Sequence, residues 1–362
     1  MKPKNIPRPS FFADAQFTGT IRKFAAEAES SGSLHPQQLS IIYNEGWFNL
    51  FVPKEYGGLE LSLPEGLRIE ESLAWIDGSM GWTVTLCGGA NWFIGFLAPE
   101  TAEMIFDSQK VCLAGSGRAN GIAKMINDGY EISGDWPYAT GAAHATAFTA
   151  NCIIEKDGIP LQNEDGSQAI AAFIFLKNEV SIREDWKAMG MKATSSNSFS
   201  VNKVFVTKAR KFNIDEKQAI LPGKIYQYPF LQFAESTLAV NVSGMAIHFL
   251  DLFEAIRKER KSNDHFINEQ LLACSLQLNE ARQAFYQTIE RSWNAGNGSN
   301  QFSQDTLTEV SKISRLLANT SLKMVDNMFP FCGLIAADPG SEINRVWRNI
   351  HTACLHPLLL LS

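Results

Sequence analysis

The sequence lacks the short motifs that identify several large classes of enzyme. It contains neither a GxGxxG nor a GxxxxGK[ST] loop, so it offers no glycine-rich cradle for nucleotide phosphates. Its six cysteines form no CxxC pair, and no GxSxG elbow is present. His351 and Cys354 lie three residues apart, but no second cysteine or carboxylate nearby completes a ligand set. These absences argue against a Rossmann or P-loop site, a disulfide framework, a metal centre and an α/β-hydrolase nucleophile.

An excess of positive charge is also missing. The 32 lysines and arginines are outnumbered by 38 aspartates and glutamates, which gives a net charge of −6. We therefore expect no nucleic-acid partner and no attachment to an anionic membrane, because both need clustered cations. No apolar run follows the basic residues at the N-terminus, so the sequence predicts a cytoplasmic protein without a secretory signal.

Apolar residues are plentiful, at 45% of the chain against 19% charged residues, which predicts a large buried core. One stretch, from Gly78 to Pro99, has no charged side chain and is long enough to cross a bilayer. It contains five glycines together with Thr83, Thr85 and Asn91, so its hydrophobicity falls short of that of a spanning helix. We therefore predict a buried helix within a folded protein.

The pattern of apolar residues changes twice along the chain. Residues 1–109 show helical periodicity, whereas residues 110–215 carry apolar or alternating runs separated by Gly, Asn and Asp turns. Residues 216–362 return to helical periodicity, with three long apolar stripes and a short fourth helix. The sequence predicts an α+β protein: an N-terminal helical domain, a middle antiparallel β-domain and a C-terminal four-helix bundle. A cleft between the β-domain and the bundle would suit a planar cofactor.

Four short segments follow one another in the order of a known family's motifs. They are Gly46–Gly58 (GWFNLFVPKEYGG), Asp77–Trp82 (DGSMGW), Gly134–Gly141 (GDWPYATG) and Trp186–Ser196 (WKAMGMKATSS). Together they resemble the acyl-CoA dehydrogenase superfamily of flavoproteins, over roughly residues 11 to 356. The resemblance implies that family's fold, a flavin cofactor and assembly as a homotetramer or a homodimer.

The third segment resembles the strand that faces the flavin. The resemblance implies that Trp136, Tyr138 and Gly141 contact the cofactor. It also implies that the hydroxyl of Thr140 lies beside N5 of the isoalloxazine ring, where a hydroxyl can donate a hydrogen bond. A threonine on a half-buried strand beside a core tryptophan is the alternative interpretation.

The segment Leu113–Gly117 (LAGSG) resembles the loop along the pyrimidine edge of the flavin. It implies cofactor contacts from Gly115 and Ser116, because small residues permit close approach of the backbone. The same resemblance places the uncharged stretch behind the substrate pocket, with Asn91 and Trp92 facing the pocket.

The C-terminal segment separates two branches of the superfamily. Acyl-CoA dehydrogenases carry a catalytic Glu near their end that removes the α-proton of a thioester, whereas this chain has no Glu after Glu342. Its ending, Arg345–His351 (RVWRNIH) followed by His356, is more similar to that of two-component flavin monooxygenases. Those enzymes use reduced flavin from a separate reductase to oxidise small aromatic or related substrates, and a histidine that titrates near neutrality assists. The resemblance implies that His356 is catalytic; a helix-terminal histidine stabilised by the helix dipole is the alternative.

Departures from the family pattern keep other hypotheses open. Asn349 stands where the family has an aspartate, which weakens an expected ion pair with Arg348. The segment Arg257–Ser262 (RKERKS) lacks the RxxFG motif that contacts the FAD pyrophosphate, so the cofactor is FAD, FMN or a loosely held reduced flavin. Glu235 lies near the position of an alternative base in some dehydrogenases, so acyl-CoA dehydrogenation with Glu235 as the base is a second hypothesis. A non-catalytic oligomeric scaffold is the third.

Overall fold

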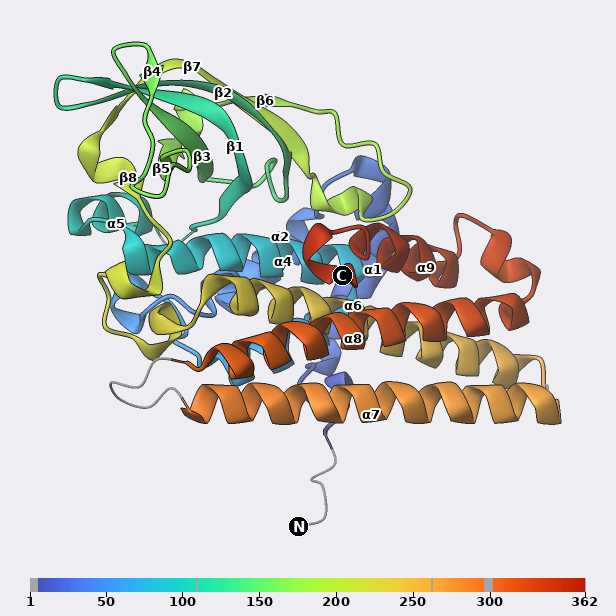
Figure 1. Ribbon diagram of the computed structural model, residues 1–362. Helices are drawn as coiled ribbons and strands as arrows, with labels where there is room; N and C mark the ends of the chain where they lie inside the picture. Colours follow the sequence, from blue (N-terminus) through green and yellow to red (C-terminus); the bar gives the residue numbers. More distant parts are fainter. Residues whose placement is uncertain (1–5, 109, 262, 296–301, 362) are drawn as a thin grey trace.

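The computed structural model describes residues 6–108, 110–261, 263–295 and 302–361. Figure 1 shows a sheet packed on a stack of helices, with α4 and α5 next to the sheet and α6, α8 and α7 following below. The chain runs from helices to sheet and back to helices, in the predicted order.

The N-terminal region is helical, as predicted. Asp14 begins the first helix by accepting hydrogen bonds from the amides of Gln16 and Phe17, and Asp77 caps α4 through the amide of Met80 at 2.8 Å. Almost every residue of α4 is buried, which explains why this helix carries no charge. The helices are α1 (Ala15–Ser31), α2 (Pro36–Asn44), α3 (Leu63–Ile76), α4 (Gly78–Asn91) and α5 (Pro99–Phe106).

The middle region is one sheet with the strand order β6-β7-β2-β1-β3-β5-β8, and β4 pairs with β3. The strands are β1 (Leu113–Ile126), β2 (Gly129–Ala139), β3 (Ala147–Lys156), β4 (Ile159–Pro160), β5 (Ile170–Leu176), β6 (Ser181–Arg183), β7 (Asn197–Thr207) and β8 (Lys211–Phe212). The prediction of an antiparallel domain is wrong for one pair, because β1 and β3 are parallel. The hairpin partner β2 occupies one edge of β1, so β3, which runs in the same direction as β1, takes the other edge.

The C-terminal helices are α6 (Phe230–Glu259), α7 (His265–Ala295), α8 (Gln304–Met328) and α9 (Glu342–Ala353). By length and composition alone, α6 could cross a membrane, yet 72% of its most apolar window is buried inside the protein. The central helix of a folded bundle passes the same test, so α6 is the core of this bundle. The uncharged stretch singled out in the sequence is instead the shorter helix α4 and the turn that follows it.

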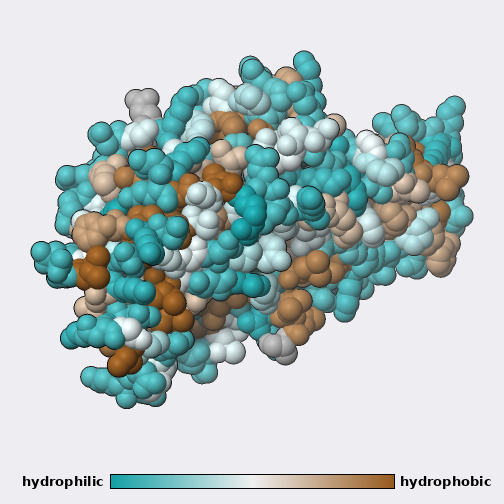
Figure 2. All heavy atoms as spheres, turned by 90° about the horizontal axis from the view of Figure 1, so that it is seen from above, coloured by the Kyte–Doolittle hydropathy of each residue, from teal (hydrophilic) through white to brown (hydrophobic). Residues whose placement is uncertain are grey.

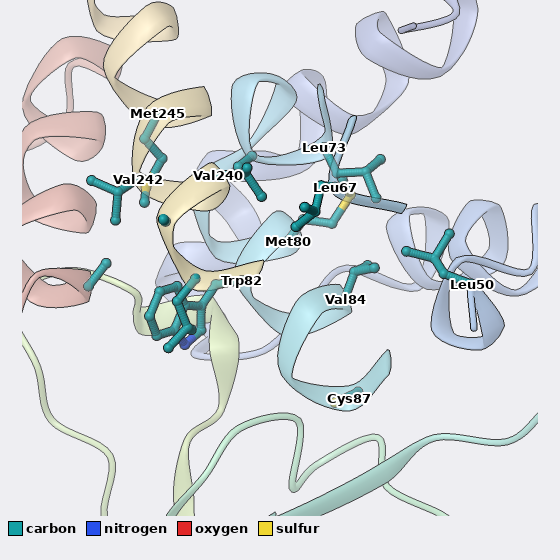
Figure 3. Packing of buried hydrophobic residues seen from close by; sticks show 14 of the residues in the cluster. Leu50, Leu67, Leu73, Met80, Trp82, Val84, Cys87, Val240, Val242 and Met245 are labelled. Atoms are coloured by element: carbon teal, nitrogen blue, oxygen red, sulfur yellow. The ribbon is translucent and has the colours of Figure 1, made fainter. Parts of the chain in front are cut away.

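Helices α3, α4 and α6 pack at very short range. A Cβ at Gly81 of α4 would lie 2.5 Å from the backbone of Ala74, and a Cβ at Gly244 of α6 would lie 2.2 Å from the carbonyl of Glu71. Both distances are shorter than any side chain tolerates, so these positions require glycine. Figure 3 shows Leu67 and Met80 lying together where these helices meet.

A buried ion pair joins the same region to α7. The two carboxyl oxygens of Glu71 each accept a hydrogen bond from the Arg282 guanidinium at 2.8 Å. The hydroxyls of Tyr286 and Ser243 donate to the same carboxylate at 2.9 and 2.5 Å. The charge of Glu71 is therefore fully compensated by partners from α6 and α7.

The outer face of the sheet is mixed in character. Figure 2, which views the molecule from above, shows hydrophobic residues in several patches separated by hydrophilic ones. Ile159 and Phe205 are among the exposed hydrophobic side chains of the β-domain. Scattered exposure of this kind is normal for a folded protein.

Candidate active site

A cavity of about 330 Å³ lies between the sheet and the helices. Most residues on the sheet side are small or polar, and most on the helix side are aliphatic or aromatic. The sheet residues at the cavity are Gly115, Ser116, Gly117, Tyr138, Thr140, Thr149, Ala150, Asn151, Ala172 and Phe212. The others are Thr85, Leu86, Gly89, Ala90, Phe93, Ile214, Phe230, Phe233, Ala234, Thr237, Leu238, His356 and Leu358. The predicted site residues Gly115, Ser116, Tyr138, Thr140 and His356 meet at this cavity.

The β1 strand is irregular where it borders the cavity. Its pairing with β3 shifts between Ser116 and Gly121, which takes residues 117–120 out of the regular ladder. The side-chain amide of Asn151 donates to the carbonyl of Gly117 at 2.9 Å and fixes this detour. Within this irregular segment Gly117 lines the cavity, and the small side chains beside it leave room for a flat ring.

Thr140 follows directly after β2 and is almost fully buried. Its hydroxyl lies 2.9 Å from the hydroxyl of Ser196, and Ser196 lies 2.7 Å from the hydroxyl of Thr194. Thr194 donates in turn to the carbonyl of Met191 at 2.8 Å. A row of three hydroxyls therefore runs from the cavity wall into the protein.

His356 is the ionisable imidazole among the described residues that line the cavity. Its Nδ1 accepts a hydrogen bond from the Leu358 amide at 3.3 Å, which caps the 3₁₀ turn Pro357–Leu359. Burial lowers the pKa of His356 below its ordinary value, so the ring is neutral at pH 7. Because Nδ1 accepts, the neutral ring carries its hydrogen on Nε2 and can donate it to a ligand. His356 thus follows α9 and caps the next turn, instead of lying in the last turn of a helix.

Tyr138 departs from the regular strand. It has a φ of +66°, and the pairing of β2 with β7 shifts between Trp136 and Ala139. This conformation is strained for a residue with a side chain, and such strain occurs often at binding sites. The ring packs edge-on against Trp186, and the guanidinium of Arg118 lies 5.6 Å from the centre of the ring. Tyr138 therefore forms the exposed rim of the cavity.

Two predicted cofactor contacts lie elsewhere. Trp136 is fully buried in the separate core of the β-domain, where its ring stacks on Phe199 at 5.2 Å and its Nε1 donates to the Asn151 carbonyl. The change of direction at Tyr138 leaves Trp136 on the inner side of the sheet. Gly141 is not at the cavity either: with a φ of +81° it forms the turn after Thr140, and its amide donates to the Thr194 carbonyl at 2.8 Å. Gly141 therefore fixes the backbone beside Thr140, whereas Trp136 belongs to the core of the β-domain.

The predicted pocket residues Asn91 and Trp92 lie behind the cavity wall. The Asn91 amide group bonds to Asn49 at 2.7 Å and accepts from the Leu113 amide at 2.9 Å, which ties α4 to β1. Trp92 is fully buried, and its ring stacks on Phe233, which is the residue that reaches the cavity. The prediction that Asn91 and Trp92 face the pocket is therefore wrong, because helical rotation turns these two side chains away from the cavity, although neighbouring residues of the same segment line it.

Glu235 does not reach the cavity, although its neighbours Ala234 and Thr237 do. It lies on the face of α6 that meets α8, and its Oε1 accepts from the Arg315 guanidinium at 2.6 Å. A carboxylate held on that face by an ion pair cannot reach a ligand on another side of the helix. The structure therefore contradicts the role of Glu235 as a catalytic base.

The residues that depart from the family pattern also have definite places. The side-chain oxygen of Asn349 accepts a hydrogen bond from the Met191 amide at 2.6 Å. Arg348 finds its carboxylate partner in Glu29. The segment Arg257–Ser262 begins about 28 Å along α6 from the cavity residue Leu238, at 1.5 Å per residue; residue 262 lies outside the described residues.

Several cavity residues were not predicted. Phe230 and Phe233 form the part of the aromatic wall that α6 contributes, and Asn151 fixes the irregular backbone of β1. Two phenylalanines three residues apart at the start of a helix are the available signal. The same pattern is typical of a buried core, so only the three-dimensional structure distinguishes the two.

Two family models match this sequence. Residues 13–97 match the model described as acyl-CoA dehydrogenase, N-terminal domain, and residues 234–359 match acyl-CoA dehydrogenase, C-terminal domain. Together these ranges exceed half of the chain. The chain belongs to the acyl-CoA dehydrogenase family. Membership confirms the predicted fold, with helices before and after a sheet.

Two relatives within this family extend over most of the chain. The oxygenase subunit HsaA of a flavin-dependent monooxygenase from Rhodococcus jostii RHA1 is 20% identical, over 93% of this chain and 91% of its own. The indole-3-acetate monooxygenase of Acinetobacter baumannii is 22% identical, over 93% of this chain and 87% of its own. The predicted resemblance to the flavin-monooxygenase branch is confirmed.

A solved structure shows the same fold. XiaF from Streptomyces sp., in complex with FADH2 and glycerol, superposes with a TM-score of 0.86 at 18% identity, over 95% of this chain and 89% of its own. At this level of identity the likeness concerns the fold alone.

Proposed function

We propose that this protein is the oxygenase component of a flavin-dependent monooxygenase that oxidises an uncharged aromatic compound. The observation that carries the proposal is the chemistry of the cavity, where neutral His356 is present and, among the described lining residues, no carboxylate is. A dehydrogenase needs a carboxylate base, whereas a monooxygenase can work with a neutral hydrogen-bond donor.

The cavity fits a flavin. Gly115 and Ser116 leave space at the sheet wall, and the irregular backbone that begins at Gly117 would supply amides for the polar edge of a flat heterocycle. Bound in reduced form, the flavin would supply the two electrons with which one atom of O2 enters the substrate and the other leaves as water. The hydroxyl of Thr140 would then meet the ring nitrogen that changes protonation.

The chain's own residues have distinct tasks in this proposal. His356 donates a hydrogen bond from Nε2 to an oxygen at the reaction site, and burial keeps it neutral for this purpose. Phe230 and Phe233 provide an aromatic surface against which a ring can pack and exclude water. Since no Lys or Arg lines the cavity among the described residues, a substrate carboxylate would be buried without a partner, so the substrate is uncharged.

Partners follow from the same proposal. In this proposal a separate flavin reductase would supply the reduced flavin. Relatives named as an oxygenase subunit and as an oxygenase component support this arrangement, because such a name implies a separate partner. Assembly as a homotetramer or a homodimer is proposed from the family's architecture.

The test combines binding with oxygen incorporation. Purified protein would receive reduced FMN or FAD without oxygen, then ¹⁸O2 and indole as the aromatic probe. We expect bound reduced flavin and an indole product carrying one ¹⁸O atom, measured by mass spectrometry. Bleaching of bound oxidised FAD by butyryl-CoA would instead support the dehydrogenase hypothesis, and failure to bind either flavin in either redox state would support the scaffold.

A further inference from the structure

The segment Trp186–Ser196, one of the four that resemble the family's motifs, also has a structural role at the cavity. In the structure it supplies the row of hydroxyls behind Thr140, through Ser196 and Thr194. Both residues are buried, and Thr194 is 0% exposed, so water does not compete for these hydrogen bonds. The geometry of the row determines which oxygen of each pair donates.

The direction is fixed at the inner end. A carbonyl oxygen can only accept, so the single hydrogen of the Thr194 hydroxyl lies on the 2.8 Å contact with the Met191 carbonyl. Thr194 then has no hydrogen left for Ser196, and Ser196 must donate to Thr194 across 2.7 Å. Ser196 in turn has none left for Thr140, so Thr140 must donate to Ser196 across 2.9 Å. The hydrogen of Thr140 therefore points away from the cavity.

The inner end is itself held rigidly. The Met191 amide donates to Asn349 of α9 at 2.6 Å, and the Met191 carbonyl also receives the indole N–H of Trp186 at 2.8 Å. The Thr194 carbonyl accepts from the Gly141 amide at 2.8 Å, which fastens the motif to the turn after Thr140. The hydrogen bonds of the row cannot reverse their direction without breaking the contact with the Met191 carbonyl, which is held in place by α9 and by the turn after Thr140.

The consequence concerns the redox state of the cofactor. Facing the cavity, Thr140 offers only lone pairs, so it can accept a hydrogen bond and cannot donate one. Oxidised flavin presents an unprotonated N5, which is also an acceptor, whereas reduced flavin carries a hydrogen there. We propose that Ser196 and Thr194 are positioning residues that fix Thr140 as an acceptor and thereby make this site prefer reduced over oxidised flavin. This inference depends on the flavin site of the proposed function, and it replaces the sequence-based expectation that Thr140 donates to N5.

The experiment measures dissociation constants of reduced and oxidised FMN by anaerobic titration. In Ser196→Ala, the hydroxyl of Thr140 loses its acceptor and turns to the cavity, so oxidised FMN binds more tightly and the preference for reduced FMN falls by about tenfold. In Thr194→Val, Ser196 loses its acceptor and donates to Thr140 instead. The hydroxyl hydrogen of Thr140 then turns to the cavity, so we expect the same loss of preference although Thr194 is two hydrogen bonds away from the cavity. For a two-electron couple, a tenfold loss of preference lowers the midpoint potential of the bound flavin by about 30 mV.

Matched variants separate this role from a structural one. Thr194→Ser keeps a hydroxyl that can reach the Met191 carbonyl, so it retains the preference. Ser200→Ala removes a hydroxyl from β7, which follows these residues, and leaves the preference unchanged because Ser200 is outside the row. The proposal is overturned if Ser196→Ala and Thr194→Val weaken both redox forms equally or leave their ratio unchanged. Should Thr194→Val fail to fold, the gain in oxidised-FMN affinity expected for Ser196→Ala decides alone. A wild-type protein that binds neither form would instead overturn the proposed function.

Discussion

The interior of the helical region contains paired charges, whereas the cavity contains no Asp, Glu, Lys or Arg among its described lining residues. Glu71 pairs with Arg282 between α3 and α7, and Glu235 pairs with Arg315 between α6 and α8. Charge thus joins helices to one another, while the cavity relies on hydroxyls, backbone amides and one neutral imidazole. The difference implies that stability and chemistry can be altered separately.

The largest effect is expected where a buried pair is broken. Arg282→Met leaves the Glu71 carboxylate buried without its cation, which should cost about 3–5 kcal/mol of the free energy of unfolding. Urea unfolding would measure the loss. The matched control is Arg291→Met on the same helix, where an exposed pair with Glu309 is worth less than about 1 kcal/mol. Equal losses in the two variants would contradict the comparison.

Next in size is the loss of the neutral imidazole. His356→Ala should lower the rate of indole oxygenation by about a hundredfold, because the donor to the reacting oxygen is removed, while stability changes little. Single-turnover oxygenation of indole by the reduced-flavin complex would measure the rate. Glu235→Gln is the control and should leave that rate within about twofold of wild type. The reverse ranking would revive the hypothesis of Glu235 as a base.

A smaller effect is expected from charge on the substrate. Indole should be oxidised with a kcat/KM at least about tenfold higher than indole-3-acetate, since the carboxylate of the latter would lose its hydration without gaining a cation. Competition between the two compounds in one reaction measures the ratio directly. Similar kcat/KM values for the two compounds would show that the substrate's carboxylate stays in water or pairs with a cation. The proposal of an uncharged substrate would then fail.

The smallest expected effect is a change in the free energy of unfolding with pH, and it concerns Glu70, the buried neighbour of Glu71. Burial raises the pKa of Glu70 to about 8, and contact with Thr85 offsets this only in part. Between its ordinary pKa of 4.5 and 8, the unfolded chain loses this proton while the folded chain keeps it, so stability falls as pH rises through that range and the fall ends above 8. Glu70→Gln should remove this dependence and gain about 1 kcal/mol relative to wild type from pH 6 to pH 7.

Urea unfolding at the two pH values measures that gain. Glu103→Gln is a suitable control, since it replaces an exposed carboxylate on α5. A constant difference between Glu70→Gln and wild type would show that Glu70 is ionised in the folded protein.

The sequence predicted those features that periodicity and local motifs determine. The long helices of the bundle follow from their apolar stripes, and the meeting of Thr140 with His356 follows from the family resemblance. The errors at Trp136 and Asn91 arise because an irregular φ at Tyr138 and the rotation of α4 decide which way side chains face. Neither feature is visible in residue types alone.

The row of hydroxyls was unpredictable for a related reason. Its members are Thr140, which follows β2, and Thr194 and Ser196, which precede β7, so they come together only through tertiary contacts. Its direction depends on a single carbonyl, that of Met191. The parallel pairing of β1 with β3 likewise depends on which edge of β1 remained free, a choice that strand-forming residues do not encode.

The glycine contacts at Gly81 and Gly244 bear on how this enzyme could acquire new substrates. They hold α4 and α6, which form the helix side of the cavity, against α3 with no room for sliding. The cavity is therefore preformed, and a ligand that does not fit cannot be accommodated by moving a helix. Exchange of side chains such as Phe230 and Phe233 on this fixed framework is then the available route by which evolution, or an engineer, could change the range of substrates.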